Sequence, residues 1–283
     1  MNIKAFLMKI RRFYLRLPLR MKIIILAVVF AILAVGGIGV YNRELSMGPK
    51  DSNDYLGENG NKTAINPGNI GGIGNIDEPK PKEVIVVIDP GHGGEDLGAY
   101  NGILYEKDIN LDISLKLGKL LEDMGIEVVY TRKTDVFVDL EPRVDLANKL
   151  EATLFISVHS NSMPDNSEYR GTETLYCPSL NPKYSKMDGR KLAIIVQKEL
   201  VKTLGTVDNG IIERPNLAVL RKTMMPAVIA EIAYISNPSD RAKLSDDAFR
   251  KKSAQALANA VINALDEMGA VKDENGTYTI IED

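Results

Sequence analysis

Hydrophobic residues are distributed in two ways along the chain: one long uninterrupted run near the start, and many short runs from residue 83 onward. The long run, residues 23–41, reads IIILAVVFAILAVGGIGVY and contains no charged residue. At 1.5 Å per residue, a helix of this length spans about 28 Å, close to the hydrocarbon thickness of a bilayer. The pattern therefore predicts an N-terminal transmembrane helix at 23–41.

The charges around this run indicate its orientation. Residues 1–22 hold seven Lys and Arg residues, and the first acidic residue of the chain is Glu44. The positive-inside rule places a basic segment in the cytoplasm and the rest of the chain outside. We therefore expect a single-pass signal anchor in the cell membrane, with the remaining domain on the cell-wall side. A cleavable signal peptide is the alternative, although the basic segment and the hydrophobic run are both long for a signal peptide and no clean A-x-A cleavage site follows.

Residues 42–82 are rich in Asn, Gly, Pro and Asp and have no helix or strand periodicity, which is typical of a flexible linker. A globular domain is expected at 83–269, followed by a C-terminal tail at 270–283. Without the seven basic residues of 1–22, 28 of the 35 basic residues remain against 38 acidic ones. This negative balance excludes nucleic acid as a partner, because phosphates require a basic surface.

Within the domain, short apolar runs alternate with amphipathic stretches. The apolar runs predict strands at 84–88, 126–130, 154–158, 172–176 and 226–235. The amphipathic stretches predict helices at 106–124, 142–150, 192–204 and 251–268. This alternation predicts a three-layer α/β domain, in which a mainly parallel, mixed sheet carries helices on both faces.

The two histidines of the chain, His92 and His159, both follow predicted strands. Catalytic groups collect at the carboxyl ends of parallel strands, so both imidazoles are expected at one edge of the sheet. The alternative for each is a hydrogen bond to a nearby carbonyl. A phosphate site in the Gly-rich loop around His92, or a serine hydrolase built on Asp89, His92 and Ser160, lacks its usual motif.

Glu231 interrupts an otherwise apolar predicted strand. A buried ionised carboxylate needs a metal, a cation or a raised pKa, unless Glu231 faces solvent or pairs with a residue such as Arg221. Two imidazoles and a carboxylate form a common catalytic zinc site, and a second carboxylate can act as general base. Composition does not identify the third ligand of the metal. Glu106 is a candidate; alternatively, it is an acidic residue in the first turn of a helix, where the helix dipole favours negative charge. The single cysteine, Cys177, excludes a disulfide framework and a cysteine-cluster metal site.

Five motifs follow one another in a fixed order between residues 84 and 268. They are Val87–Gly94, Glu106–Asp108, Thr131–Asp135 with Arg143 and Asn148, Ile156–Asn161, and Met225–Asn237. In this combination the domain resembles the zinc-dependent N-acetylmuramoyl-L-alanine amidases of the Amidase_3 family. The resemblance implies one Zn²⁺ bound by His92, Glu106 and His159, with Glu231 as the catalytic carboxylate. It also implies hydrolysis of the amide between N-acetylmuramic acid and L-alanine in peptidoglycan.

In such a site zinc lowers the pKa of its bound water toward 7, and Glu231 would accept the water proton. We expect Asp89 to accept a hydrogen bond from a ligand histidine and so fix its tautomer. Arg132, Arg143 and Asn148 are expected to tie helices to the sheet rather than to take part in catalysis. Two other functions stay open: a zinc peptidase acting on peptidoglycan peptides, and a non-catalytic, membrane-anchored wall-binding protein. The sequence points to no particular regulatory protein.

Overall fold

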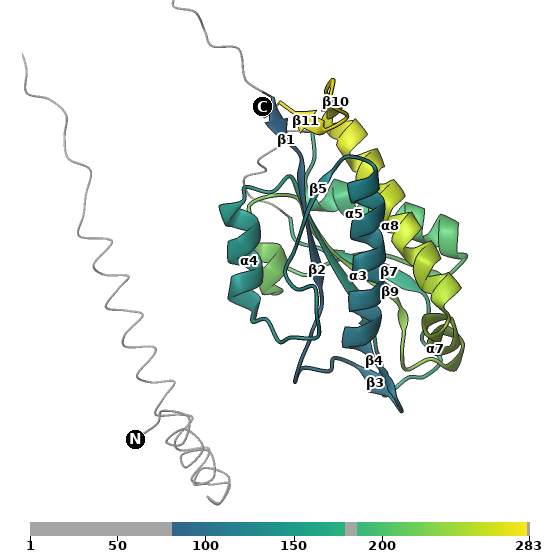
Figure 1. Ribbon diagram of the computed structural model, residues 1–283. Coiled ribbons are helices and arrows are strands. Elements are labelled where there is room, and N and C mark those ends of the chain that lie inside the picture. Colours follow the sequence, from purple (N-terminus) through teal and green to yellow (C-terminus); the bar gives the residue numbers. More distant parts are fainter. Residues whose placement is uncertain (1–80, 179–185, 282–283) are drawn as a thin grey trace, which may run out of the picture. The chain divides into compact units, whose positions relative to one another are not determined.

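The computed structural model describes residues 81–178 and 186–281 (Figure 1). Among these residues, no helix combines the length and the apolar character needed to cross a membrane. The predicted cytoplasmic segment 1–22, the transmembrane helix 23–41 and nearly all of the linker 42–82 lie outside the described residues. They stay predictions.

A six-stranded sheet forms the centre of the domain, with strand order β5-β2-β6-β9-β7-β8. Its strands are β2 (Ile85–Pro90), β5 (Glu127–Tyr130), β6 (Leu154–Asn161), β7 (Thr172–Tyr176), β8 (Asp208–Glu213) and β9 (Ala227–Tyr234). Neighbouring strands are parallel except β7 and β9, which are antiparallel. The predicted α/β fold with a mainly parallel, mixed sheet is therefore confirmed.

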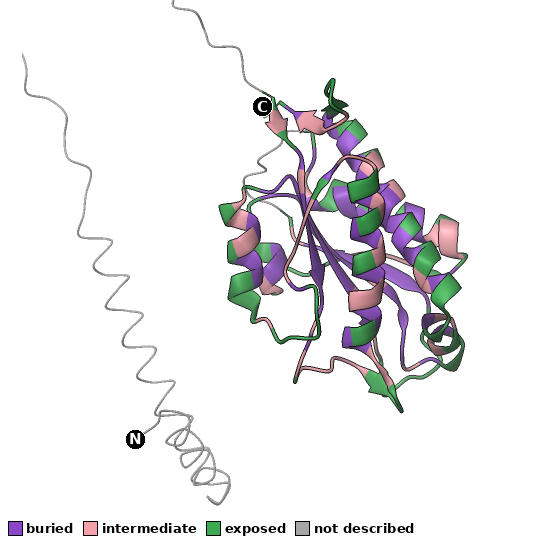
Figure 2. Ribbon diagram, viewed as in Figure 1, coloured by how far each residue is buried: buried purple, intermediate pink, exposed green. Residues whose placement is uncertain are grey.

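Helices cover both faces of this sheet (Figure 1). One face carries α3 (Glu106–Asp123), α5 (Gly189–Leu204) and α8 (Asp247–Met268), and the other carries α4 (Leu140–Lys149) and α6 (Ala218–Arg221). Along β2, Val86 and Ile88 pack in the core beneath α3, α5 and α8, whereas Val87 packs in the core beneath α4 and α6. Successive side chains of a strand point to opposite faces, so a continuously apolar strand needs cover on both sides. Figure 2 shows the sheet buried between helices whose outer surfaces are exposed.

Several short elements were absent from the sequence-based prediction. β3 (Tyr100–Asn101) and β4 (Leu104–Tyr105) form a hairpin directly before α3, and α7 (Pro238–Ser245) follows β9. A second sheet pairs β11 (Tyr278–Ile280) with β1 (Lys82–Glu83) and β10 (Val271–Lys272). Lys82, the last residue of the predicted linker, and Glu83, the first of the predicted domain, therefore pair with a strand from the predicted tail. This small sheet and the β3–β4 hairpin lie at opposite ends of the domain (Figure 1).

Candidate metal centre

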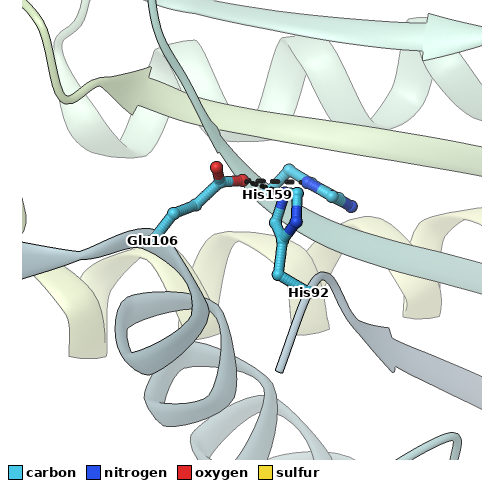
Figure 3. Close-up of side chains that lie close together, drawn as sticks. All are labelled: His92, Glu106 and His159. Atoms are coloured by element: carbon cyan, nitrogen blue, oxygen red, sulfur yellow. Dashed lines mark hydrogen bonds and ion pairs between the residues drawn. The ribbon is translucent and has the colours of Figure 1, made fainter. Parts of the chain in front are cut away.

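Three potential ligand side chains meet at the carboxyl ends of β2 and β6 (Figure 3). His92 comes from the loop after β2, Glu106 is the first residue of α3, and His159 lies on β6. One nitrogen or carboxylate oxygen from each lies within 4.8 Å of the others. The two imidazole rings are 4.9 Å apart between centroids and meet edge to face. The fold thus brings both histidines to one edge of the sheet, as their positions after strands predicted.

The carboxylate of Glu106 is held by backbone and side-chain donors. Its Oε2 accepts a hydrogen bond from the Ala99 N–H at 2.7 Å. Its Oε1 accepts from the Ser160 N–H and from Asn110 Nδ2, each at 3.2 Å. These donors come from the residue before β3, from β6 and from the next turn of α3. The position of the carboxylate is therefore set by the fold independently of any ligand.

The charges of the three residues depend on one another. Nδ1 of His159 lies 2.9 Å, and Nε2 of His92 lies 3.2 Å, from Oε1 of Glu106. Burial raises the pKa of Glu106, but hydrogen bonds from the two imidazoles outweigh this and hold the pKa well below its usual range. Burial lowers the pKa of His159, but Glu106 more than offsets this and raises it to about 9. A protonated imidazole here compensates the buried carboxylate, which is also what a bound cation does.

His92 is held in an unusual backbone conformation. Its φ of 61° lies in the left-handed region, which non-glycine residues seldom adopt. Its carbonyl oxygen accepts a hydrogen bond from Arg143 Nη2 at 2.9 Å, and its Nδ1 lies 2.8 Å from Oδ2 of Asp96. The other oxygen of Asp96 accepts from the Gly98 N–H at 3.2 Å. Asp96 therefore orients the imidazole so that Nε2 faces Glu106, as carboxylates commonly do for metal-binding histidines.

The expectation that Asp89 would orient a ligand histidine is wrong. Its carboxylate accepts hydrogen bonds from Thr131 at 2.6 Å, from Arg143 at 2.7 Å and from Ser157 at 2.7 Å. Burial raises the pKa of Asp89, but Arg143 and these hydrogen bonds outweigh burial, so the pKa is lowered overall. The reason is the pleat of β2: Asp89 points to the same face as Val87, where α4 presents Arg143.

Two buried arginines fix the loop that carries His92, in agreement with the structural role expected for them. Arg132 donates to the carbonyl oxygens of Pro90 at 3.0 Å and of Gly91 at 2.9 Å. Arg143 donates to the same Pro90 oxygen at 2.9 Å. Gly91 has no room for a side chain, because a Cβ there would lie 2.2 Å from the ring of His159. The loop backbone and the His159 imidazole are thus in direct contact.

Glu231 lies one strand farther along the same edge of the sheet. It is in register with His159 on β6 and with Glu173 on β7. Its Oε2 is buried and has no hydrogen-bond partner among the described residues, and burial raises the pKa of the carboxyl group to about 7. Arg221, the alternative partner, donates instead to the Pro215 carbonyl. A carboxylate with these properties is suited to accepting a proton.

Sequence reasoning missed a polar cluster beside Glu231. Asn161 Nδ2 donates to Oε1 of the buried Glu173 at 2.8 Å and to the hydroxyl oxygen of Tyr234 at 3.2 Å. The available signal was the one that singled out Glu231, an acidic residue within a predicted strand. Asp96 and Asn110 carried no such signal, because Asp96 lies in a polar loop and Asn110 lies in an amphipathic stretch where polar residues are ordinary.

The donor set fits a catalytic zinc ion. Two imidazole nitrogens and one carboxylate oxygen are a common protein ligand set for Zn²⁺ that leaves a position for water. The side chains of His92 and His159 are 25% and 20% exposed, so solvent and substrate reach them. Glu231, whose Oε2 has no partner within residues 81–178 and 186–281, lies on the neighbouring strand. These are the groups that a metal-assisted hydrolase requires.

Comparison with known proteins gives a consistent result. Residues 86–263 match the family model Amidase_3, described as N-acetylmuramoyl-L-alanine amidase. The N-acetylmuramoyl-L-alanine amidase LytC of Bacillus subtilis is 36% identical over 178 residues, which cover 63% of this chain and 35% of LytC. The catalytic domain of the amidase CwlV from Bacillus (Paenibacillus) polymyxa is 38% identical with a TM-score of 0.59, over 65% of this chain and 98% of that one. The Clostridioides difficile amidase CwlD, solved in complex with the GerS lipoprotein, is 30% identical with a TM-score of 0.59, over 65% and 98% of the respective chains.

Proposed function

The chain belongs to the Amidase_3 family of N-acetylmuramoyl-L-alanine amidases, and from this we propose that it hydrolyses the amide between N-acetylmuramic acid and L-alanine in peptidoglycan. We propose further that His92, Glu106 and His159 bind a Zn²⁺ ion and that Glu231 is the general base. The observation that carries the proposal is the gathering of these four side chains at one edge of a sheet with the family's fold.

Each residue of the site has a distinct task in this proposal. When bound, Zn²⁺ polarises the scissile carbonyl and lowers the pKa of a water molecule. Asp96 accepts the Nδ1 proton of His92 and so leaves Nε2 available as a ligand atom. The unpartnered oxygen of Glu231 takes a proton from the attacking water, and the carboxyl group then delivers it to the departing alanine nitrogen.

Digestion of purified peptidoglycan with identification of the products tests the reaction. Free stem peptides that begin with L-alanine are the expected products. Shortened peptides that remain attached to the glycan would identify a peptidase instead. No release of either product by the zinc-loaded protein would favour a non-catalytic wall-binding protein.

The role of Glu231 is tested with Glu231→Gln. This variant is expected to keep its zinc and to lose at least about 100-fold in rate, because an amide cannot accept the proton. Glu267→Gln, an exposed position on α8, is the matched control and should retain the wild-type rate. Digestion at the wild-type rate by Glu231→Gln would contradict the assignment.

Metal dependence and location are tested separately. Removal of the metal with a chelator should abolish activity, and added Zn²⁺ should restore it; full activity of metal-free protein would contradict the mechanism. We also propose that residues 23–41 anchor the protein in the cell membrane with the amidase domain outside, on the basis of the 19-residue uncharged run and the basic segment before it. Protease added to intact protoplasts should then degrade the domain, and protection of the domain would contradict this orientation.

A further inference from the structure

A cavity of about 300 Å³ adjoins the metal centre. Both His92 and His159 line it, so it opens directly onto the ligand side chains. Phe137 and Leu140 also line it, together with Val219 of α6. The volume is at the lower end of the range for small-molecule sites. The cavity is therefore large enough for one compact part of a substrate.

The order of the strands defines which side of the metal centre this cavity occupies. Along the edge of the sheet, β5 is followed by β2, β6 and β9. Phe137 lies in the connection from β5 to α4, and its backbone contacts Gly94 in the loop after β2, so it lies on the β5–β2 side of the ligands. Leu140 is the first residue of α4. Glu231, on β9, lies on the other side. Most residues that line the cavity come from the end of β2 and from the segment between β5 and β6, and Glu231 is not among them.

This arrangement orients the substrate. The proton carried by Glu231 must reach the alanine nitrogen, so the amine half of the substrate extends toward β9. The acyl half, which contains the lactyl group and the sugar, then extends in the opposite direction, toward the cavity. This conclusion rests on the proposed amidase function and on the role of Glu231.

The walls of the cavity match the chemistry of a sugar. Phe137 and Leu140 are 48% and 52% exposed, and together they form an apolar rim. A sugar ring presents C–H groups on its face, which pack well against an aromatic ring. Asp96 and Asp139 also line the cavity, and a carboxylate oxygen can accept a hydrogen bond from a hydroxyl group in addition to the one that it already accepts.

The loop that carries Phe137 is fixed to the loop that carries His92. Asp135 accepts hydrogen bonds from the Gly94 N–H at 2.7 Å and from Lys107 Nζ at 2.5 Å. A Cβ on Gly94 would lie 2.6 Å from the backbone nitrogen of Phe137, so the two backbones are in contact. The apolar rim is thus held at a set distance from the metal ligands, and little ordering is needed when the substrate binds.

We propose that this cavity is the subsite for the N-acetylmuramoyl half of the substrate, with Phe137 packing against the sugar ring and the stem peptide extending toward β9 and β7. Phe137 is then a residue that determines preference for a glycan-linked peptide over a peptide that carries only a small acyl group.

Two soluble substrates test this subsite: N-acetylmuramoyl tripeptide, and the same tripeptide carrying only an N-lactyl group. The wild type is expected to have the higher kcat/KM for the muramoyl substrate. Phe137→Ala should lower this preference ratio about tenfold, mainly through KM, because the aromatic contact is lost. Val136→Ala is the matched control: Val136 is also 48% exposed, precedes Phe137 directly and does not line the cavity. This control should keep the wild-type ratio.

Intact peptidoglycan provides a second measurement. Free N-acetylmuramic acid is expected to inhibit its digestion competitively, and about tenfold more weakly in Phe137→Ala. Equal kcat/KM of the wild type for both soluble substrates, an unchanged ratio in Phe137→Ala, or no inhibition by the free sugar would overturn the subsite. The proposed function is tested first, with the wild type alone. If the wild type releases no peptides beginning with L-alanine from peptidoglycan, the proposed function fails together with the subsite.

Discussion

Gly91→Ala tests how the loop after β2 shapes the metal centre. A Cβ at this position would lie 2.2 Å from Cε1 and Nε2 of His159, whereas ordinary contacts begin near 3.4 Å. The loop has little freedom to retreat, because the Gly91 N–H donates to the Val158 carbonyl at 3.0 Å and its own carbonyl is held by Arg132 at 2.9 Å. The imidazole must therefore shift by about 1.2 Å, the difference between the two contact distances.

A shift of this size displaces one of the three proposed zinc ligands. Loss of ligand orientation typically weakens metal binding by about 10- to 100-fold, and because a ligand itself is displaced here, we expect the Kd for Zn²⁺ to rise by about 100-fold. This corresponds to about 2.7 kcal/mol of binding free energy. Titration of zinc against a chromophoric chelator of known affinity measures the change directly, and circular dichroism checks that the fold is intact.

Gly205→Ala is the control for general destabilisation. Gly205 ends α5 with a φ of 61°, and a Cβ there would meet no atom within 4 Å. Alanine at this position should lower the free energy of unfolding by about 1 kcal/mol and leave zinc affinity unchanged. If Gly91→Ala binds zinc within about threefold of the wild type, the contact between this loop and His159 does not control the metal centre.

Three further predictions concern the charged groups around the site. Asp89→Asn should lower the free energy of unfolding by about 3 kcal/mol in urea denaturation, because Arg143 keeps its buried charge without a partner. In the wild type, folding lowers the pKa of Asp89, so its ionised carboxylate stabilises the fold fully above the unfolded pKa of about 3.9. This stabilisation is lost as the pH falls through the folded pKa. If acid unfolds Asp89→Asn with an equally steep dependence on pH, this reasoning is contradicted. Asp96→Asn should weaken zinc binding by about 10- to 100-fold, measured by the same chelator titration, because Nδ1 of His92 loses its carboxylate acceptor. Zinc binding to metal-free protein at pH 7 should release at least one proton, because Glu106 raises the pKa of His159 to about 9; heats of binding that do not vary among buffers of different ionisation enthalpy would show otherwise.

Sequence patterns predicted the main elements of the domain because those patterns are local. A strand buried on both faces must be apolar at nearly every position, and a helix lying on a sheet must be apolar every three or four residues. The predicted strand at 172–176 coincides with β7, and the predicted helix at 106–124 differs from α3 by one residue. β8 was missed because it is an edge strand whose sequence, DNGIIE, lacks a continuous apolar run.

The candidate site divides in the same way. Both histidines and Glu231 stood out from the sequence, since the histidines follow apolar runs and Glu231 interrupts one. Asp96 did not stand out, and Asp89 was given its role by mistake. The distinction between these two aspartates depends on the direction of the β2 pleat and on the position of α4 above it. Neither can be read from the spacing of residues along the chain.

The sequence by itself therefore determined the α/β architecture, the position of both histidines after strands and, through its ordered motifs, the family resemblance. Only the tertiary structure decided which acidic groups face those histidines and which support the loops around them. The physical reason is range. Hydrophobic periodicity arises within a few residues, whereas the contacts that build the site join His159 to Glu106 across 53 positions and Arg143 to Asp89 across 54. Such pairs become neighbours only when parallel strands and their covering helices are packed together.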